Sequence, residues 1–299
     1  MAVRILQEQC RGCGGCLSAC PWGLLHLSEK DELNARGSRY SVLADVDACR
    51  TCGRCATVCT AGVLSVPASE AAHALLDTDG FPPHAGCQLG TLASAIARVA
   101  EKEGLSEHLV LFKQSASEVG IHIETHDFDG PEFFEAALAF KREHPDRLVL
   151  IISPSAKKQS TEESIRRYQK LSQESVTLID TCDWFETAPG FSQGPTVSGG
   201  DYLAPFVEEG KASFIARGML GTPEDVRKTE RYIAQALRYQ DEGRPYSLVQ
   251  VVYPCFYRLL GRPQRPLEAE ELDQVRTWFA TYVAPSRTMG VLLDRKDDC

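Results

Sequence analysis

The spacing of apolar residues changes character along the C-terminal two thirds of the chain. Some recur three or four positions apart, as on one face of a helix, and the first such set is Leu89, Leu92, Ala93, Ile96, Val99 and Ala100. Further helices are predicted from Pro131 to just before Pro145, from Thr222 to about Arg238, and over 268–283. Between them stand short apolar runs typical of buried strands: HLVLF, RLVLII, SVTLI, ASFIAR and YSLVQVV. This alternation predicts an α/β domain with a mostly parallel sheet and helices on both faces.

The first 66 residues follow another pattern, which is set by cysteine. Eight of the twelve cysteines fall in two runs of identical C-x2-C-x2-C-x3-C spacing, CRGCGGCLSACP and CRTCGRCATVCT. Each cysteine of the second run lies 39 positions after its counterpart. The flanks repeat as well, since Gly23-Leu24-Leu25 matches Gly62-Val63-Leu64 and Val3 matches Val42. We interpret this as an internal duplication of a short strand, a cysteine loop and a second short strand.

The spacing of the cysteines is typical of iron–sulfur ligation. Three cysteines two residues apart wrap a loop around one cluster, and the fourth serves the other cluster. The first cluster is therefore assigned to Cys10, Cys13, Cys16 and Cys59. The second cluster is assigned to Cys20, Cys49, Cys52 and Cys55. We expect Gly12, Gly14 and Gly15 to let backbone N–H groups approach the sulfurs. Structural zinc and disulfides are the alternatives, but zinc sites usually show paired C-x2-C knuckles and disulfides do not suit a reducing compartment.

Residues 1–66 resemble the bacterial ferredoxins that carry two [4Fe–4S] clusters. The resemblance implies an α+β ferredoxin-like domain that moves single electrons and performs no bond chemistry by itself. A chain of 299 residues with 43% hydrophobic content is expected to form two domains with real cores. Because Pro67, Pro82 and Pro83 bracket a stretch that disfavours helix, we predict a linker over 67–84 and a second domain over 85–299.

Charge and hydropathy exclude several classes of function. The net charge is -9 and no basic stripe occurs, which argues against nucleic-acid binding. No apolar run approaches the roughly 18 residues of a membrane span, and the first residues lack the apolar core of a signal peptide. We therefore expect a cytoplasmic protein whose thiols stay reduced.

The second domain also resembles a known family. The stretches HAGCQLGTLASAIARVAEKEGL, SFIARGMLGTPEDVRKTERYIAQALRYQDEGRPYSLVQVVYPC and PLEAEELDQVRTWFATYVAPSRTMGVLLDRKDD are similar to the β subunit of 2-oxoacid:ferredoxin oxidoreductases. The resemblance implies a thiamine-diphosphate-binding-like fold over roughly residues 84–299. In that family a Gly-Asp-Gly turn after one strand and an Asn after the next hold the magnesium ion that bridges the diphosphate.

The positions of that magnesium site hold other residues in this chain. Ser153-Pro154-Ser155 stands where the family has Gly-Asp-Gly, so no carboxylate is present, and Pro154 lacks an N–H. Thr181 stands at the position of the Asn, and nearby Asp183 is a possible displaced ligand. The site is therefore predicted to be degenerate, with Ser155 and Thr181 in place of its ligands. The alternative is a solvated loop that leads into a helix capped by Ser160.

Other candidates have less support. The family often carries a further cluster, whose cysteines match only Cys87 and Cys255 here, with His84 as a possible substitute, and buried structural thiols are the simpler interpretation. No role is predicted for Cys182 or Cys299. A metal site at His122, His126 and Asp127, and an anion site in the glycine-rich stretch GFSQGPTVSGGD, are weaker alternatives to ordinary polar loops.

Three functions remain open. The first is an iron–sulfur electron-transfer subunit built on a degenerate thiamine-diphosphate domain, working with the other subunits of a 2-oxoacid oxidoreductase-like complex and a soluble electron carrier. The second is an active thiamine-dependent β subunit in which Asp183 still holds the cofactor. The third is a fused ferredoxin whose C-terminal domain binds a different ligand. We favour the first.

Overall fold

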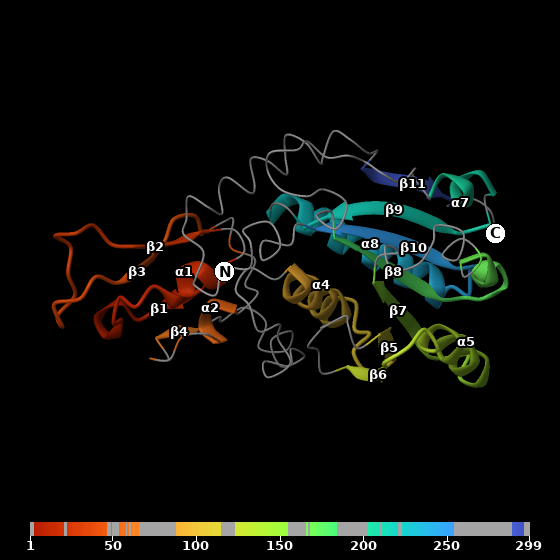
Figure 1. Cartoon of the computed structure of the whole chain (residues 1–299), viewed down its shortest axis with the longest axis horizontal. Helices are drawn as coiled ribbons and strands as arrows, with labels where there is room; N and C mark the ends of the chain where they lie inside the picture. The colour runs from red at the N-terminus through yellow and green to blue at the C-terminus, as the bar shows by residue number, and fades with distance from the viewer. Residues whose placement is uncertain are drawn as a thin grey trace.

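The structure is a computed structural model, and it forms two lobes, a small N-terminal one and a larger α/β one (Figure 1). Within the 299 residues, the structure describes residues 3–20, 23–46, 49, 54–57, 59, 61, 63–65, 88–114, 123–154, 166, 168–183, 203–209, 211–220, 223–253 and 289–295. The predicted linker 67–84 and the predicted helix 268–283 lie outside these residues. None of the helices in the described part of the chain is long and apolar enough to cross a membrane.

The N-terminal lobe contains the duplicated unit that the sequence predicts. Each copy supplies two short strands and one short helix, namely β1 (Arg4–Ile5), α1 (Gly15–Ala19) and β2 (Leu25–Leu27), then β3 (Ser41–Leu43), α2 (Arg54–Thr57) and β4 (Leu64–Ser65). The two helices begin 39 positions apart, as the cysteines do. β1 pairs antiparallel with β4, and β2 pairs antiparallel with β3. Each two-stranded sheet thus takes one strand from each copy, so the copies are interleaved rather than placed side by side.

The strand pairing corrects one detail of the predicted repeat. In one sheet the Ala44 N–H donates to the Leu24 carbonyl at 2.8 Å, and in the other the Leu6 N–H donates to the Val63 carbonyl at 2.8 Å. Leu24 and Val63 are 39 apart, but Leu6 and Ala44 are 38 apart. The first copy has one residue fewer between its first strand and its first cysteine. Val3 is therefore equivalent to Ser41, and the sequence match of Val3 with Val42 is wrong in structural terms.

The α/β lobe is built on a seven-stranded sheet in the order β11-β9-β10-β8-β7-β5-β6. All neighbours are parallel except the edge strand β11, which runs antiparallel to β9. The strands are β5 (Leu109–Gln114), β6 (Glu124–Phe128), β7 (Leu148–Pro154), β8 (Thr177–Asp183), β9 (Phe214–Met219), β10 (Ser247–Tyr253) and β11 (Gly290–Asp294). The mostly parallel sheet confirms the α/β prediction for this part of the chain.

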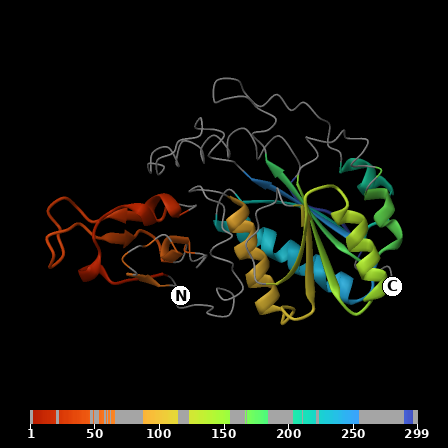
Figure 2. The same ribbon diagram turned by 60° about the horizontal axis from the view of Figure 1, so that its bottom comes forward.

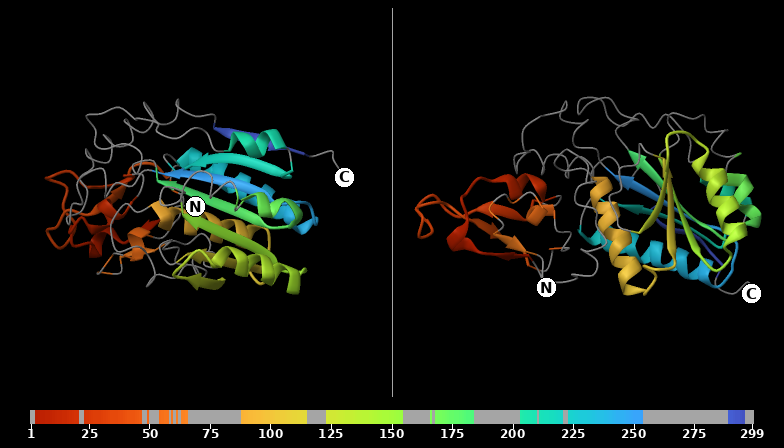
Figure 3. Two further views of the ribbon diagram at one scale, coloured as in Figure 1. Left: turned by 45° about the vertical axis from the view of Figure 1, so that its right-hand side comes forward. Right: turned by 90° about the horizontal axis from the view of Figure 1, so that it is seen from below.

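Helices cover both faces of the sheet, as the alternating pattern predicts (Figure 2). α4 (Gln88–Lys102) and α8 (Pro223–Asp241) lie on one face, and α5 (Phe133–Glu143) and α7 (Ala204–Glu209) lie on the other. Figure 3 shows the same layers from two further directions. Each layer has its own apolar core, with Leu92, Ile96 and Val249 on the first face and Phe134, Leu178 and Leu248 on the second. Gly104, with φ of 70°, follows α4 at the predicted stop.

Among the strands and α-helices described in the α/β lobe, three have no counterpart in the sequence prediction. β6 has an exposed, polar sequence without an apolar run, and α7 is too short for helical periodicity to show. β11 is placed by contacts far along the chain, since the Tyr239 hydroxyl of α8 donates to Asp294 Oδ1 at 2.6 Å. Burial, reinforced by that hydrogen bond, raises the pKa of Tyr239 to about 12, so the phenol remains a donor at neutral pH.

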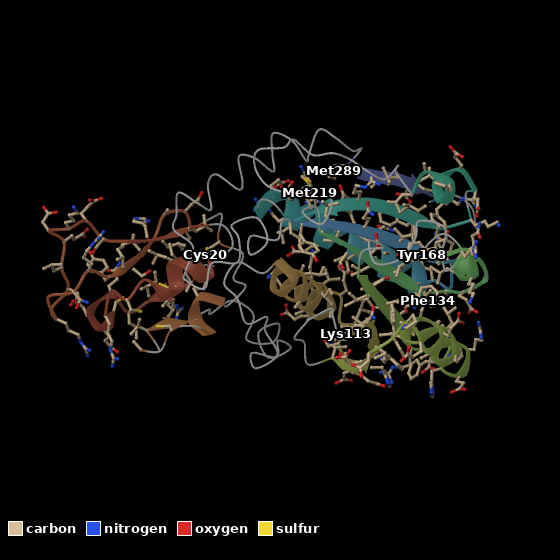
Figure 4. All side chains as sticks on the ribbon, in the orientation of Figure 1. Cys20, Lys113, Phe134, Tyr168, Met219 and Met289 are labelled. Carbon is tan, nitrogen blue, oxygen red and sulfur yellow. The ribbon has the colours of Figure 1, made fainter. Side chains whose placement is uncertain are left out.

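A row of polar side chains runs through the core of the α/β lobe. Ser153, Asp180, Gln250 and Arg217 are neighbours across β7, β8, β10 and β9, and each is at most 2% exposed. Gln250 Nε2 donates to Asp180 Oδ2 at 2.9 Å, and Arg217 Nε donates to Gln250 Oε1 at 2.6 Å. The Tyr168 hydroxyl donates to Asp180 Oδ1 at 2.9 Å from beside Phe134 (Figure 4). Because buried charges are costly unless paired, this network strongly favours one register of the central strands.

Replacing Asp180 should destabilise this lobe. Asp180→Ala leaves the Tyr168 hydroxyl and the Gln250 amide without their buried acceptor, and at about 1–3 kcal/mol for each unsatisfied donor we expect a loss of about 2–6 kcal/mol in the free energy of unfolding. Urea unfolding of the full chain, followed by far-ultraviolet circular dichroism, measures it. Glu143→Ala, on the exposed side of α5, is the matched control and should change stability by less than about 0.5 kcal/mol. Equal stability of the two variants would contradict the structural role of Asp180.

Candidate functional site

Four cysteines line one small cavity in the N-terminal lobe. Cys10 and Cys13 come from the loop before α1, Cys16 comes from α1 itself, and Cys59 comes from the chain after α2. Leu27, Ser41, Val63 and Leu64 complete much of the wall. The fourth cysteine of the second run thus faces the first three cysteines of the first run. The interleaved strands account for this, since they bring the end of one copy beside the beginning of the other.

The thiols around the cavity differ in exposure. Cys10 and Cys16 are buried, Cys59 is half-buried, and Cys13 is exposed. Cys16 Sγ lies 3.2 Å from the hydroxyl oxygen of Ser41, which begins β3 and is fully buried. Burial raises the pKa of the Cys16 thiol, while the Ser41 hydroxyl opposes that rise. A metal that binds here would have to compensate for the desolvation of a thiolate.

The fourth cysteine of each run is held in the same way. The Leu24 N–H donates to Cys20 Sγ at 3.4 Å, and the Val63 N–H donates to Cys59 Sγ at 3.4 Å. Leu24 and Val63 are equivalent residues of the two copies, so this backbone-to-sulfur hydrogen bond is part of the repeat. Figure 4 labels Cys20 at the end of α1. Hydrogen bonds to sulfur stabilise negative charge on a thiolate.

The loop between β2 and β3 holds the first cysteine loop from outside. Asn34, 7% exposed, donates through Nδ2 to the carbonyls of Gln7 and Cys10, each at 2.8 Å. Its Oδ1 accepts the N–H groups of Arg36 and Ser38, each at 3.1 Å. The Asn34 side chain therefore links the backbone of its own loop to the backbone of the first cysteine loop. In the sequence Asn34 is one of several polar residues in a loop. Nothing in the composition of that loop predicts its contact with the Cys10 carbonyl.

Two of the three glycines in the first cysteine loop have positive φ. Gly12 has φ of 63° and Gly14 has φ of 75°. A Cβ on Gly12 would lie 2.5 Å from the Arg39 carbonyl oxygen, whereas a Cβ on Gly14 would meet nothing within 4 Å. Gly15 begins α1 and is not among the positive-φ residues. The expectation that these three glycines let backbone N–H groups approach the sulfurs stays a prediction.

The second set of cysteines is described in part. Cys20 and Cys55 are buried and Cys49 is half-buried. Cys55 lies in α2 at the position equivalent to Cys16 in α1. Cys52 lies outside the described residues, and the second ligand set therefore stays a prediction.

Where the structure describes the predicted degenerate magnesium site, its residues lie in the sheet. Ser153 is buried and lies in β7, where Pro154 pairs with Thr181 of β8. The Thr181 hydroxyl, 2% exposed, donates to the Ser153 carbonyl at 3.1 Å. Asp183 ends β8, but its side chain, like all of Ser155, lies outside the described part of the structure. Of the predicted degenerate positions, Thr181 is therefore the one whose side chain can be placed, and its hydroxyl faces another strand.

The weaker candidate sites from the sequence fall into two groups, those that the structure describes and those that it does not. His126 stacks on Phe112 and lies 3.2 Å from Glu124, while Asp127, one residue along β6, accepts from Lys113 Nζ at 2.8 Å. His126 and Asp127 thus take part in separate contacts, and within the described residues no three His, Cys, Asp or Glu side chains form a site for a single metal ion. His84, Cys87, His122, Cys255, Cys299, the side chain of Cys182 and the glycine-rich stretch at 190–201 lie outside the described residues.

A groove of about 610 Å³ lies between α4 and α8, away from the cysteines. Two ion pairs cross it, Arg98 with Glu230 at 2.6 Å and Arg238 with Glu103 at 3.0 Å. The hydrogen bond from Arg238 holds the pKa of Glu103 below its usual range. These pairs join the two helices, and we assign the groove a structural role.

Comparison with known proteins supports the iron–sulfur interpretation of the N-terminal lobe. Residues 9–63 match the 4Fe-4S dicluster domain family. The chain therefore carries an iron–sulfur domain at its N-terminal end. A solved 2-oxoglutarate:ferredoxin oxidoreductase from Magnetococcus marinus, with 2-oxoglutarate, coenzyme A and succinyl-CoA bound, has a similar structure with a TM-score of 0.48. It is 13% identical, over 72% of this chain and 81% of that one. No curated protein matches the chain in sequence.

Substitution at Gly12 should be far more harmful than substitution at Gly14. Gly12→Ala combines a strained positive φ with a clash against the Arg39 carbonyl, whereas Gly14→Ala meets only the strain of positive φ, about 1 kcal/mol. We expect Gly12→Ala to lose much of its bound iron on anaerobic purification and Gly14→Ala to keep it. Iron analysis per chain measures the difference. Equal iron contents would show that the contact with Arg39 does not shape the loop.

Proposed function

We propose that this protein is an iron–sulfur electron-transfer subunit of a 2-oxoacid:ferredoxin oxidoreductase-like complex. The observation that carries the proposal is the cavity lined by Cys10, Cys13, Cys16 and Cys59. Thiolates are the ligands of biological [4Fe–4S] clusters, and four of them around one cavity fit the donor set of one cluster. By the same repeat, Cys20, Cys49, Cys52 and Cys55 hold the second.

A [4Fe–4S] cluster accepts and releases one electron at a time. The chain contributes the environment of that transfer. The Leu24 and Val63 N–H groups donate to ligand sulfurs, and Asn34 together with Gly12 keeps the first cysteine loop in place. The exposed Cys13 marks the side of the first cluster that a redox partner can approach. We propose that these partners are the other subunits of the complex and a soluble carrier in the cytoplasm.

The α/β lobe serves, in this proposal, as a scaffold with a degenerate thiamine-diphosphate site. Magnesium prefers oxygen ligands of high charge, and a diphosphate in a cleft needs them to offset its own charge. The chain offers Ser153-Pro154-Ser155 at the first ligand position and Thr181 at the second. The Thr181 hydroxyl is already bonded to the neighbouring strand and is shielded from solvent. The residue types at these positions and the bond made by Thr181 support the proposal that the site is degenerate.

The first experiment measures the clusters and their ligand pairing. Anaerobically purified protein should contain about eight iron and eight acid-labile sulfide per chain. Cys20→Ser and Cys49→Ser fall in one predicted cluster, so the double variant should lose about as much iron as either single variant. Cys20→Ser with Cys10→Ser falls in two clusters and should lose about twice as much.

The reverse pattern would show that each run of cysteines holds its own cluster. Stoichiometric zinc with little iron would refute the iron–sulfur function altogether. Cys299→Ser, which lies outside both runs, is the matched control and should leave the iron content unchanged.

The second experiment tests the degenerate cofactor site. Titration calorimetry of the full chain with thiamine diphosphate and magnesium should show no tight binding. Each hydrogen bond to a charged group contributes about 1.5–3 kcal/mol, so the loss of two charged or amide ligands should cost several kcal/mol of binding free energy. Micromolar or tighter binding that Asp183→Ala abolishes would instead establish a catalytic thiamine site.

A further inference from the structure

The hydroxyl of Ser41 is placed to act on one particular ligand sulfur. Ser41 Oγ lies 3.2 Å from Cys16 Sγ, and the two residues are 0% and 7% exposed. A thiol and a hydroxyl can each donate in such a pair. A thiolate bound to iron has no proton, so in the loaded protein the hydroxyl has to be the donor. Ser41 would then direct a buried dipole at the first cluster.

The second copy of the repeat lacks this hydroxyl. Cys55 is equivalent to Cys16, since α1 and α2 begin at equivalent positions. The pairing of Arg4 with Ser65 corresponds to the pairing of Val42 with His26, so the residue before Arg4 corresponds to Ser41. That residue is Val3, which is 8% exposed and apolar. Where the first copy has a buried hydroxyl donor, the second copy thus has an apolar side chain.

We infer that the Ser41 hydroxyl raises the reduction potential of the cluster of Cys10, Cys13, Cys16 and Cys59. The inference rests on the proposed iron–sulfur function. Ser41 is a positioning and tuning residue rather than a ligand, and the cluster that it tunes is the one with the exposed Cys13.

The physical reason is electrostatic. One electron from a donor such as dithionite adds one unit of negative charge to the cluster and its thiolates, while no bond forms or breaks. A hydrogen bond to the sulfur stabilises the reduced state more than the oxidised state, because the reduced state carries more negative charge. The effect is strong where the surroundings exclude water, as they do at Cys16 and Ser41. A valine side chain offers no donor, so this particular contribution is missing at the equivalent position of the second copy.

Exchange of the two residues tests the inference. In redox titrations of the full chain followed by electron paramagnetic resonance, Ser41→Ala should lower one of the two potentials and leave the other in place. A tenfold change in the reduction equilibrium is expected, which is about 59 mV for one electron. Val3→Ser should raise the potential that Ser41→Ala leaves in place. Ser41→Thr keeps a hydroxyl and should retain most of the original value.

Ser28→Ala is the matched control. Ser28 is also a buried serine of this lobe, 3% exposed, but its hydroxyl bonds to the Glu32 carbonyl and the Tyr40 N–H rather than to sulfur. Loss of the Ser28 hydroxyl should leave both reduction potentials unchanged. Each variant in the series should keep its full iron content. A shift of both potentials in Ser41→Ala, or no shift with both clusters present, would overturn the tuning role alone. A chain that binds no cluster would overturn the proposed function as well.

Discussion

The antiparallel pairing of β1 with β4 and of β2 with β3 is the constraint on which the N-terminal lobe depends. Neither copy of the repeat can complete a sheet from its own strands, so each copy folds against the other. The same exchange brings Cys59 to a cavity whose other three cysteines belong to the first copy. An iron–sulfur lobe of this size has a small apolar core, and the free energy of metal binding is expected to supply a large share of its stability.

Around this symmetric frame the two copies have diverged. The loop between β2 and β3 places Asn34 against the carbonyl of Cys10 and the Arg39 carbonyl against Gly12, so the first cysteine loop is tightly enclosed. Ser41 in β3 and Val3 before β1 occupy equivalent places with different chemistry. In the proposed function, this divergence gives the two clusters different surroundings.

The α/β lobe depends on hydrogen bonds between polar side chains buried in its sheet. Its central strands carry Asp180, Gln250 and Arg217 across the sheet, where an apolar row would serve packing equally well. Each polar group of this row bonds to another, so the row can remain buried. Beside this row, the side chain of Thr181 bonds β8 to the Ser153 carbonyl of β7.

The sequence by itself determined the elements whose signal is local. Apolar runs predicted β5, β7, β8, β9 and β10, helical spacing predicted α4, α5 and α8, and the cysteine spacing predicted a duplicated iron–sulfur unit. The rest depends on contacts between residues far apart in the chain. β11 is an edge strand placed by Tyr239 and β9, Asn34 acts on a carbonyl 24 residues away, and the one-residue offset that equates Val3 with Ser41 is visible only in hydrogen-bond register. Local patterns report propensity and burial, whereas register and long-range polar contacts exist only once the chain has folded.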